Sequence, residues 1–294
     1  MQRIVPHLWF DHEAYEAAQF YLSLFKDGEI VSRTKINDTP SGTAEIVTAQ
    51  FCGQEFQLLS AGPYVTFNPS ISFLITCESI EEVEAIWAKL MEQGEELMPI
   101  GDYPFSERYG WAIDRYGLSW QVMYMENRKD RPKIMPTVMF VGEQYGKAEE
   151  AMLFYTSVFE NSKPGAILRY GENAAPDQPS ATQHEEFILD NQLFAAMDSA
   201  YGHDFGFNDA VSFVVNCDTQ EEVDYYWDKL SAVPESEQCG WLKDKYGLSW
   251  QIVPTIVFEM MQSEDTKRVA RMSAALLQMK KLSIAELKEA FEKE

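Results

Sequence analysis

Histidines and cysteines are the residues of this sequence best suited to metal binding or covalent chemistry, and there are four of each. The histidines, at positions 7, 12, 184 and 203, form no HxH, HxxxH or HExxH motif. No CxxC or Cys/His pair has zinc-like spacing, and no Gly-x-Ser-x-Gly phrase marks a serine nucleophile. These patterns leave the catalytic residues unknown and predict neither a metal nor another cofactor.

Two short strand-like runs combine polar and aromatic side chains. Alternation along the first run places His7 and Trp9 on one face, and along the second it places Gln121 and Met123 on one face. A lone histidine on a strand is more often a structural or pocket residue than a metal ligand. These four side chains therefore suit hydrogen bonding and apolar contact better than catalysis by a metal.

The elements that would position these side chains follow a β-α-β-β-β order that occurs twice in the first half of the chain. Ser79, with Glu82 three residues later, forms a capping box and predicts the start of a helix. That helix buries an apolar stripe at helical spacing, from Val83 to Leu90. Strands are expected at 4–10, 29–36, 43–51, 55–59, 71–77, 109–114 and 118–124.

The second half of the chain repeats the first. Trp111–Gln121 reappears as Trp241–Gln251 with eight of eleven positions identical, and Ile71–Cys77 matches Val211–Cys217. A polar, proline-containing segment separates the copies. We expect a first domain at 1–126, a linker at 127–133, a second domain at 134–254 and a helical tail at 255–294.

The tail has a helical, charged pattern of its own. Val269, Met272, Leu276 and Met279 share one helix face, and Ser283 is placed to cap a final helix. A methionine-bearing stripe of this kind is usually part of a core and not a cofactor site. We expect the tail to pack across the repeats or against a second subunit.

Composition indicates a well-packed globular protein with a strongly acidic surface. Hydrophobic residues make up 46% of the chain, and the formal net charge is −23. Such a charge repels phosphate backbones and anionic lipids, so neither nucleic acid nor a membrane is expected as a partner. No secretory segment is recognisable at the beginning, and no apolar run reaches the roughly 20 residues of a spanning helix. A cytoplasmic protein is expected.

The chain resembles the PhnB-like family of the vicinal oxygen chelate superfamily, which also contains glyoxalases, bleomycin-resistance proteins and extradiol dioxygenases. The resemblance rests on Pro6–Phe10, Glu81–Leu90 and Gly240–Gln251. It implies an α+β fold of two tandem domains, each made of two β-α-β-β-β units that form a curved half-barrel sheet with a cleft. It also implies that the two repeats form a pseudo-dimer within one chain, and further self-association stays open.

The same resemblance indicates where metal-dependent relatives carry their ligands. The matching positions are His7, Ser70 or Ser72, and Gln121 in the first copy, and Thr137, Ala210 or Ser212, and Gln251 in the second. Only the histidine is a good ligand for a divalent cation, because neutral amides and hydroxyls bind such ions weakly. In metal-dependent relatives these positions bind a metal ion. The residues of this sequence do not form such a site, so no bound metal is expected.

What remains is a cleft suited to binding a small molecule. If Gln121 faces the cleft, then His7, Trp9 and Met123 line the first copy, while Thr137 and Gln251 line a less polar second copy. The first copy is the expected site. An equally weighted alternative is that the aromatic residues only fill the half-barrel.

Three hypotheses about function follow. The leading one is metal-independent binding of a small, partly aromatic molecule. The second is an enzyme of the same superfamily, of lyase, isomerase or dioxygenase type, with an unconventional site. The third is a non-catalytic scaffold or interaction protein. The methyltransferase label that related sequences carry is unsupported, because no Gly-rich turn for S-adenosylmethionine is present.

Overall fold

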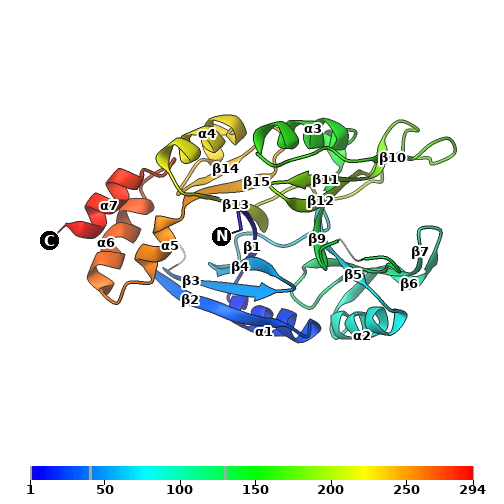
Figure 1. Ribbon diagram of the computed structural model, residues 1–294, viewed down its shortest axis with the longest axis horizontal. Coiled ribbons are helices and arrows are strands. Elements are labelled where there is room, and N and C mark those ends of the chain that lie inside the picture. Colours follow the sequence, from blue (N-terminus) through cyan, green and yellow to red (C-terminus); the bar gives the residue numbers. More distant parts are fainter. Residues whose placement is uncertain (1, 40–41, 129–130, 294) are drawn as a thin grey trace. The chain divides into compact units, whose positions relative to one another are not determined.

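The computed structural model describes residues 2–39, 42–128 and 131–293. It divides into two compact units, each built on one mixed β-sheet with helices (Figure 1). The first unit comprises Met1–Thr66 and Asn208–Glu294, and the second comprises Phe67–Phe207. The α+β fold and the helical tail predicted from the sequence are confirmed.

The first unit combines the beginning and the end of the chain. From the first repeat come β1 (Ile4–Phe10), α1 (Ala14–Leu24), β2 (Gly28–Thr39), β3 (Gly42–Phe51) and β4 (Gln54–Ser60). From the second come β13 (Val211–Cys217), α4 (Gln220–Leu230), β14 (Trp241–Lys243) and β15 (Ser249–Pro254), and the tail adds α5 (Ile256–Met261), α6 (Thr266–Leu276) and α7 (Ile284–Glu292).

The seven-stranded sheet of this unit has the order β14-β15-β13-β1-β4-β3-β2. Its centre is the antiparallel pair β1 and β13, in which His7 lies opposite Ser212. On its other side β1 runs parallel to β4, and His7 lies opposite Gln57. Three polar side chains from three neighbouring strands therefore meet on one row of the sheet.

The second unit uses the middle of the chain. It contains β5 (Ile71–Cys77), α2 (Ile80–Leu90), β6 (Glu95–Tyr103), β7 (Ser106–Ile113), β8 (Ser119–Tyr124), β9 (Ile134–Phe140), α3 (Ala148–Val158), β10 (Ile167–Arg169), β11 (Thr182–Leu189) and β12 (Gln192–Asp198). The eight-stranded sheet has the order β10-β11-β12-β9-β5-β8-β7-β6, and β5 and β9 form its antiparallel centre.

Each sheet therefore takes one half from each repeat, and the repeats pair within the chain as a pseudo-dimer would. Three of the halves have the expected β-α-β-β-β order, but the last one, β13-α4-β14-β15, has only three strands among its described residues. The expected domains 1–126 and 134–254 describe the repeats of the sequence, whereas the compact units cut across both. The four halves have similar patterns, so periodicity cannot tell which first strand pairs with which. Of the expected linker 127–133, Lys129 and Asp130 lie outside the described residues.

Side-chain caps explain where the helices after β5 and β13 begin. Ser79 Oγ accepts a hydrogen bond from the Glu82 amide at 3.2 Å, and Thr219 Oγ1 accepts one from the Glu222 amide at 3.3 Å. The glutamate of each pair reaches back to a backbone amide just before the helix, which completes the capping box. The capping box predicted at Ser79 is confirmed.

The tail packs on parts of both repeats within the first unit. Helix α6 contacts β2 and helix α5 contacts β15. These strands lie toward opposite ends of the strand order, so the tail reaches across the sheet. Backbone amides of Cys239 and Gly240 donate to the carbonyls of Met279 and Lys280 at 2.7 and 2.8 Å. These bonds fix the segment after α6 against the sheet. Among the helices described, none has the length and apolarity needed to span a membrane.

Candidate functional site

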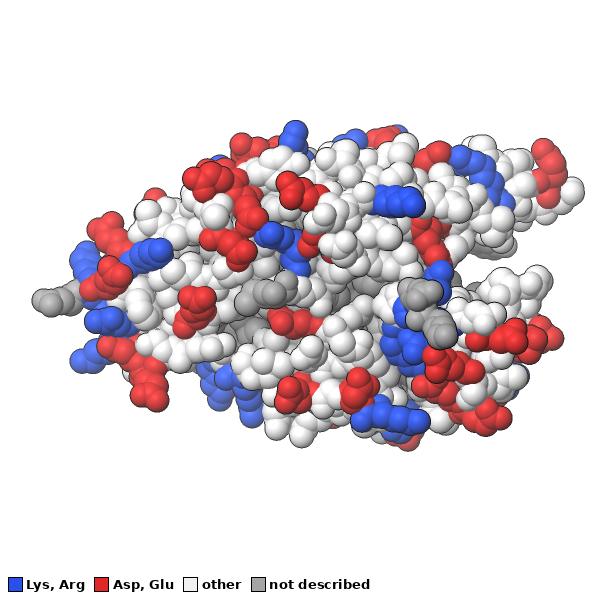
Figure 2. Space-filling view, viewed as in Figure 1, with Lys and Arg blue, Asp and Glu red and all other residues white. Residues whose placement is uncertain are grey.

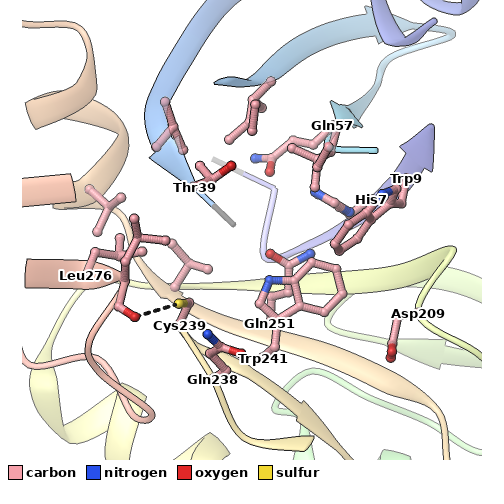
Figure 3. Close-up of a pocket in the computed structure, with 18 of the residues that line it drawn as sticks. His7, Trp9, Thr39, Gln57, Asp209, Gln238, Cys239, Trp241, Gln251 and Leu276 are labelled. Atoms are coloured by element: carbon pink, nitrogen blue, oxygen red, sulfur yellow. Dashed lines mark hydrogen bonds between the residues drawn. The ribbon is translucent and has the colours of Figure 1, made fainter. Parts of the chain in front are cut away.

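A cavity of about 580 Å³ lies in the first unit, on the side of the sheet that the tail closes. Its volume falls in the range of small-molecule sites. Ile36 from one end of the sheet and Trp241 from the other both line it, so the sheet curves around it. Figure 3 shows His7, Trp9 and Gln57 on one side, with Trp241 and Gln251 facing them.

His7 is the most unusual polar group of the cavity lining. Its side chain is only 2% exposed, and its Nδ1 makes no hydrogen bond to another described residue. Burial lowers its pKa to about 3, so the imidazole is neutral at physiological pH. No described carboxylate pairs with it, and it therefore lacks the partner that a catalytic base normally has. It is suited to give or accept a single hydrogen bond.

Two glutamines accompany His7. Gln57 on β4 is buried beside it, and Gln251 on β15 lies across the cavity. Gln251 Nε2 donates to Ser212 Oγ at 3.0 Å, and no described hydrogen bond reaches its Oε1. The polar floor of the cavity is thus neutral, with hydrogen-bonding capacity left over.

Aromatic rings form one wall. Trp241 meets the His7 ring edge-on, with 5.3 Å between ring centroids, and it meets Trp9 at 5.8 Å. Trp9 Nε1 donates to the Gly62 carbonyl at 3.0 Å, which fixes the indole plane. Tyr64 contacts Trp9 and is 65% exposed, so it lies at the edge of this wall, at the mouth of the cavity. Such a wall suits an aromatic guest.

The tail forms the opposite, apolar wall. Its contribution consists of six side chains that are all aliphatic, aromatic or methionine: Val257, Phe258, Met261, Leu276, Leu277 and Leu282. Cys239 also lines the cavity, and its Sγ lies 3.6 Å from the Leu277 carbonyl, marked as a dashed line in Figure 3. Burial raises the pKa of this thiol, so it is a poor source of the thiolate nucleophile.

The second unit has an equivalent row of residues, in which the glutamine is hydrogen-bonded at both ends, whereas Thr137 Oγ1 is buried without a partner among the described residues. Gln121 Nε2 donates to Ser72 Oγ at 2.8 Å, and Tyr109 Oη donates to Gln121 Oε1 at 2.8 Å. Thr137 lies opposite Ser72 and beside Ala195 on this row. An apolar cluster covers the same face, with Leu74, Tyr109, Met135 and Ala195 at its centre and Met123 packed against it.

The six side chains expected in a cleft are therefore divided between the units. His7, Trp9 and Gln251 come together in the cavity of the first unit. Gln121, Met123 and Thr137 lie in the second unit and do not line this cavity. Sequence reasoning missed Gln57, Trp241 and the tail side chains. Trp241 belongs to the repeated phrase, but the sequence does not reveal the strand pairing that places this residue beside His7.

The donor set of the cavity does not fit a divalent metal. The positions that correspond to ligands in metal-dependent relatives hold one imidazole, one hydroxyl and one neutral amide, and none of these carries the negative charge that would neutralise a divalent ion. Within the described part of the chain, no three His, Cys, Asp or Glu side chains are placed to hold a metal ion. A carboxylate, the group that would best neutralise such an ion, is missing from this floor.

Comparison with known proteins agrees with this architecture. A model of the family described as 3-demethylubiquinone-9 3-methyltransferase matches residues 2–123 and again residues 132–253. The PhnB protein of Bacillus cereus, named for the same methyltransferase, is 38% identical over 42% of this chain and 100% of that chain, with a TM-score of 0.40. A search among curated proteins gave no match.

Two larger solved structures are similar over most of the chain. Glyoxalase I from Zea mays is 12% identical, with a TM-score of 0.52, over 89% of this chain and 97% of that chain. A Bacillus subtilis protein named as a dioxygenase is 12% identical, with a TM-score of 0.51, over 84% of each chain. At this identity both show the fold alone. From the two family matches we conclude that the chain belongs to the PhnB-like family, described as 3-demethylubiquinone-9 3-methyltransferase, in a tandem form.

Proposed function

We propose that this protein binds a small organic molecule, without a metal, in the cavity of the first unit. The observation that carries the proposal is the neutral, buried His7, which lines a cavity of about 580 Å³ with an aromatic wall and an apolar wall. A buried polar side chain without a partner costs stability unless a ligand or water completes its hydrogen bonds. This cost makes His7 the natural anchor of a ligand.

Two other activities receive less support. A lyase, isomerase or dioxygenase of the same superfamily would need a metal or an acid–base pair, and the groups around His7 supply neither. Methyl transfer, which the family description names, is not proposed because the sequence has no Gly-rich turn for S-adenosylmethionine. We place the binding activity in the cytoplasm, a proposal supported by cysteines that are all free.

The proposal is tested by a thermal-shift screen of the full chain against aromatic metabolites and antibiotics. For the best compound, His7→Ala is expected to weaken binding at least about fivefold, the loss of one hydrogen bond. Thr137→Ala, at the equivalent position of the second unit, is the matched control and should leave binding unchanged. Each ligand-induced shift is measured against the unliganded melting temperature of the same variant.

Two results would contradict the proposal. One is a ligand-induced shift that survives His7→Ala but disappears in Thr137→Ala. The other is a stoichiometric transition metal in elemental analysis of the purified chain, which would overturn metal independence.

A further inference from the structure

The lining of the cavity carries very little charge. Among its described residues there is no lysine or arginine, and the only acidic ones are Asp209 and Glu235. The Asp209 carboxylate lies 3.2 Å from Lys243 Nζ, so its charge is largely compensated. Glu235 is exposed. The interior groups are His7, Gln57 and Gln251, all neutral.

Such a lining discriminates against ions. An ionised ligand group loses its hydration on entering the cavity, and it recovers that free energy only if a charge of opposite sign meets it. A carboxylate or phosphate finds no cation on the described lining, and the strongly acidic chain repels it before entry. A buried ammonium would find amides and an imidazole in the interior, because Asp209 is paired with Lys243 and Glu235 is exposed.

The walls select for a flat apolar body. Trp9 and Trp241 present indole rings to the cavity, and Tyr64 extends this wall to its mouth. Facing them, the tail presents Phe258, Leu276 and other apolar side chains. Aromatic pairs add favourable edge and stacking contacts to the burial of apolar area. A ring system placed between the two walls would gain from both.

We propose that the ligand is an uncharged molecule with a planar aromatic ring system and one hydrogen-bonding group. The ring lies between the indoles and the tail, and the polar group meets His7, Gln57 and Gln251. This inference rests on the proposed function, since it names the ligand class of the same cavity.

Three probes that share one ring system and differ in charge test the inference: 2-naphthol, 2-naphthoate and 2-naphthylmethylammonium. Their affinities for the full chain are measured by calorimetry at neutral pH. We expect naphthol to bind at least about tenfold more tightly than either ion, because only the ions must be buried without a counter-charge. A smaller preference, or tighter binding of an ion, overturns the ligand class.

A variant that adds a cation to the lining makes the test specific to this cavity. Gln238→Lys changes an exposed side chain of the lining, so folding should be preserved. It is expected to reduce the preference for naphthol over naphthoate at least about threefold. Gln50→Lys makes the same charge change at an exposed position outside the lining and should leave the preference unaltered. Equal effects of the two variants would contradict the inference.

Failure of this inference can be told apart from failure of the proposed function. If naphthoate binds as tightly as naphthol, and His7→Ala weakens both, then the cavity binds ligands but the uncharged class is wrong. If naphthol does not bind at all, the class is likewise wrong, and the wider compound screen decides the function.

Discussion

At the scale of residues, two equivalent glutamines have different partners. Gln121 is bonded at both ends, to Ser72 and to Tyr109. Gln251 keeps the bond to the matching serine, but the residue that corresponds to Tyr109, two positions before the repeated phrase, is Cys239. The smaller side chain supplies no hydroxyl to cover the amide oxygen. One substitution between the repeats thus helps to explain why the glutamine oxygen is bonded in one unit and available in the other.

A second feature at the residue scale, the buried carboxyl group of Glu185, affects the stability of the protein. Glu185 on β11 is fully buried, and neither carboxylate oxygen has a partner among the described residues. The pKa of Glu185 is raised to about 8, and burial is the largest cause. The negative charges of Asp198 and Glu149 also raise this pKa, whereas the positive charge of Arg169 lowers it. Glu185 is therefore mostly protonated in the folded protein near neutral pH and ionised in the unfolded chain.

The pH dependence of unfolding should reveal Glu185. Its folded pKa lies above the unfolded value of 4.5, so its contribution is complete below that value and is lost as the pH rises to about 8. We predict that the free energy of unfolding falls over this range, and that Glu185→Gln removes a decrease on the order of 3 kcal/mol. Urea unfolding at several pH values measures the effect.

The neighbouring glutamate provides a control of opposite sign. Burial works against ionisation of Glu186, but hydrogen bonds from His184 and Arg131 outweigh it and lower its pKa to about 2. Its stabilisation is present above the unfolded value and is lost only in acid, so Glu186→Gln should destabilise the protein at neutral pH. An unchanged pH profile in Glu185→Gln would show that this carboxyl is not held protonated.

At the scale of elements, local sequence predicted most helices and strands because their signals are short-range. Ser79 with Glu82 marks a helix start in any fold, and the stripe from Val83 to Leu90 marks the buried face. The expected stripe of the tail reached Met279, whereas α6 ends at Leu276. Met279 nevertheless packs, as Leu276 does, against an apolar cluster that contains Met272 and Leu287. The period of the pattern was right, and the boundary was not.

The tail is also the element that completes the cavity. Leu282 is buried, lines the cavity, and lies close to Gly240, just before β14. Its carbonyl accepts a hydrogen bond from Gln220, which holds the segment before α7 against the beginning of α4. The wall facing the indoles is thus tied to the sheet by side-chain and backbone contacts together.

Truncating this wall should cost stability. We predict that Leu282→Ala lowers the free energy of unfolding by about 2–4 kcal/mol, because it removes buried methyl groups and leaves a void. Leu168→Ala is the matched control, since that leucine is 58% exposed and its truncation should change stability by about 0.5 kcal/mol or less. Urea unfolding of both variants makes the comparison, and equal values would show that the tail does not pack as described.

At the scale of the whole molecule, the sequence revealed the repeat but not the pairing of its halves. Trp111–Gln121 and Trp241–Gln251 are so alike that either last strand could belong with His7. The pairing of β1 with β13 joins residues about two hundred positions apart, and no local pattern reports it. The fold class was therefore predictable, whereas the neighbours of His7 were not.

The charge of the molecule disfavours an anionic ligand. The net charge is −23, and Figure 2 shows carboxylates spread over the visible face with lysines and arginines between them. Such a surface slows the approach of anions, and more so at low salt. The neutral lining of the cavity and the acidic surface therefore act in the same direction.

The central claim is that one of two equivalent rows lines a binding site, while in the other the glutamine is hydrogen-bonded from within. Calorimetric stoichiometry with the best compound of the screen tests it most directly. We predict one ligand per chain, with the binding heat lost in His7→Ala and retained in Thr137→Ala. Two equal sites per chain, or one site that is insensitive to His7→Ala, would contradict the account.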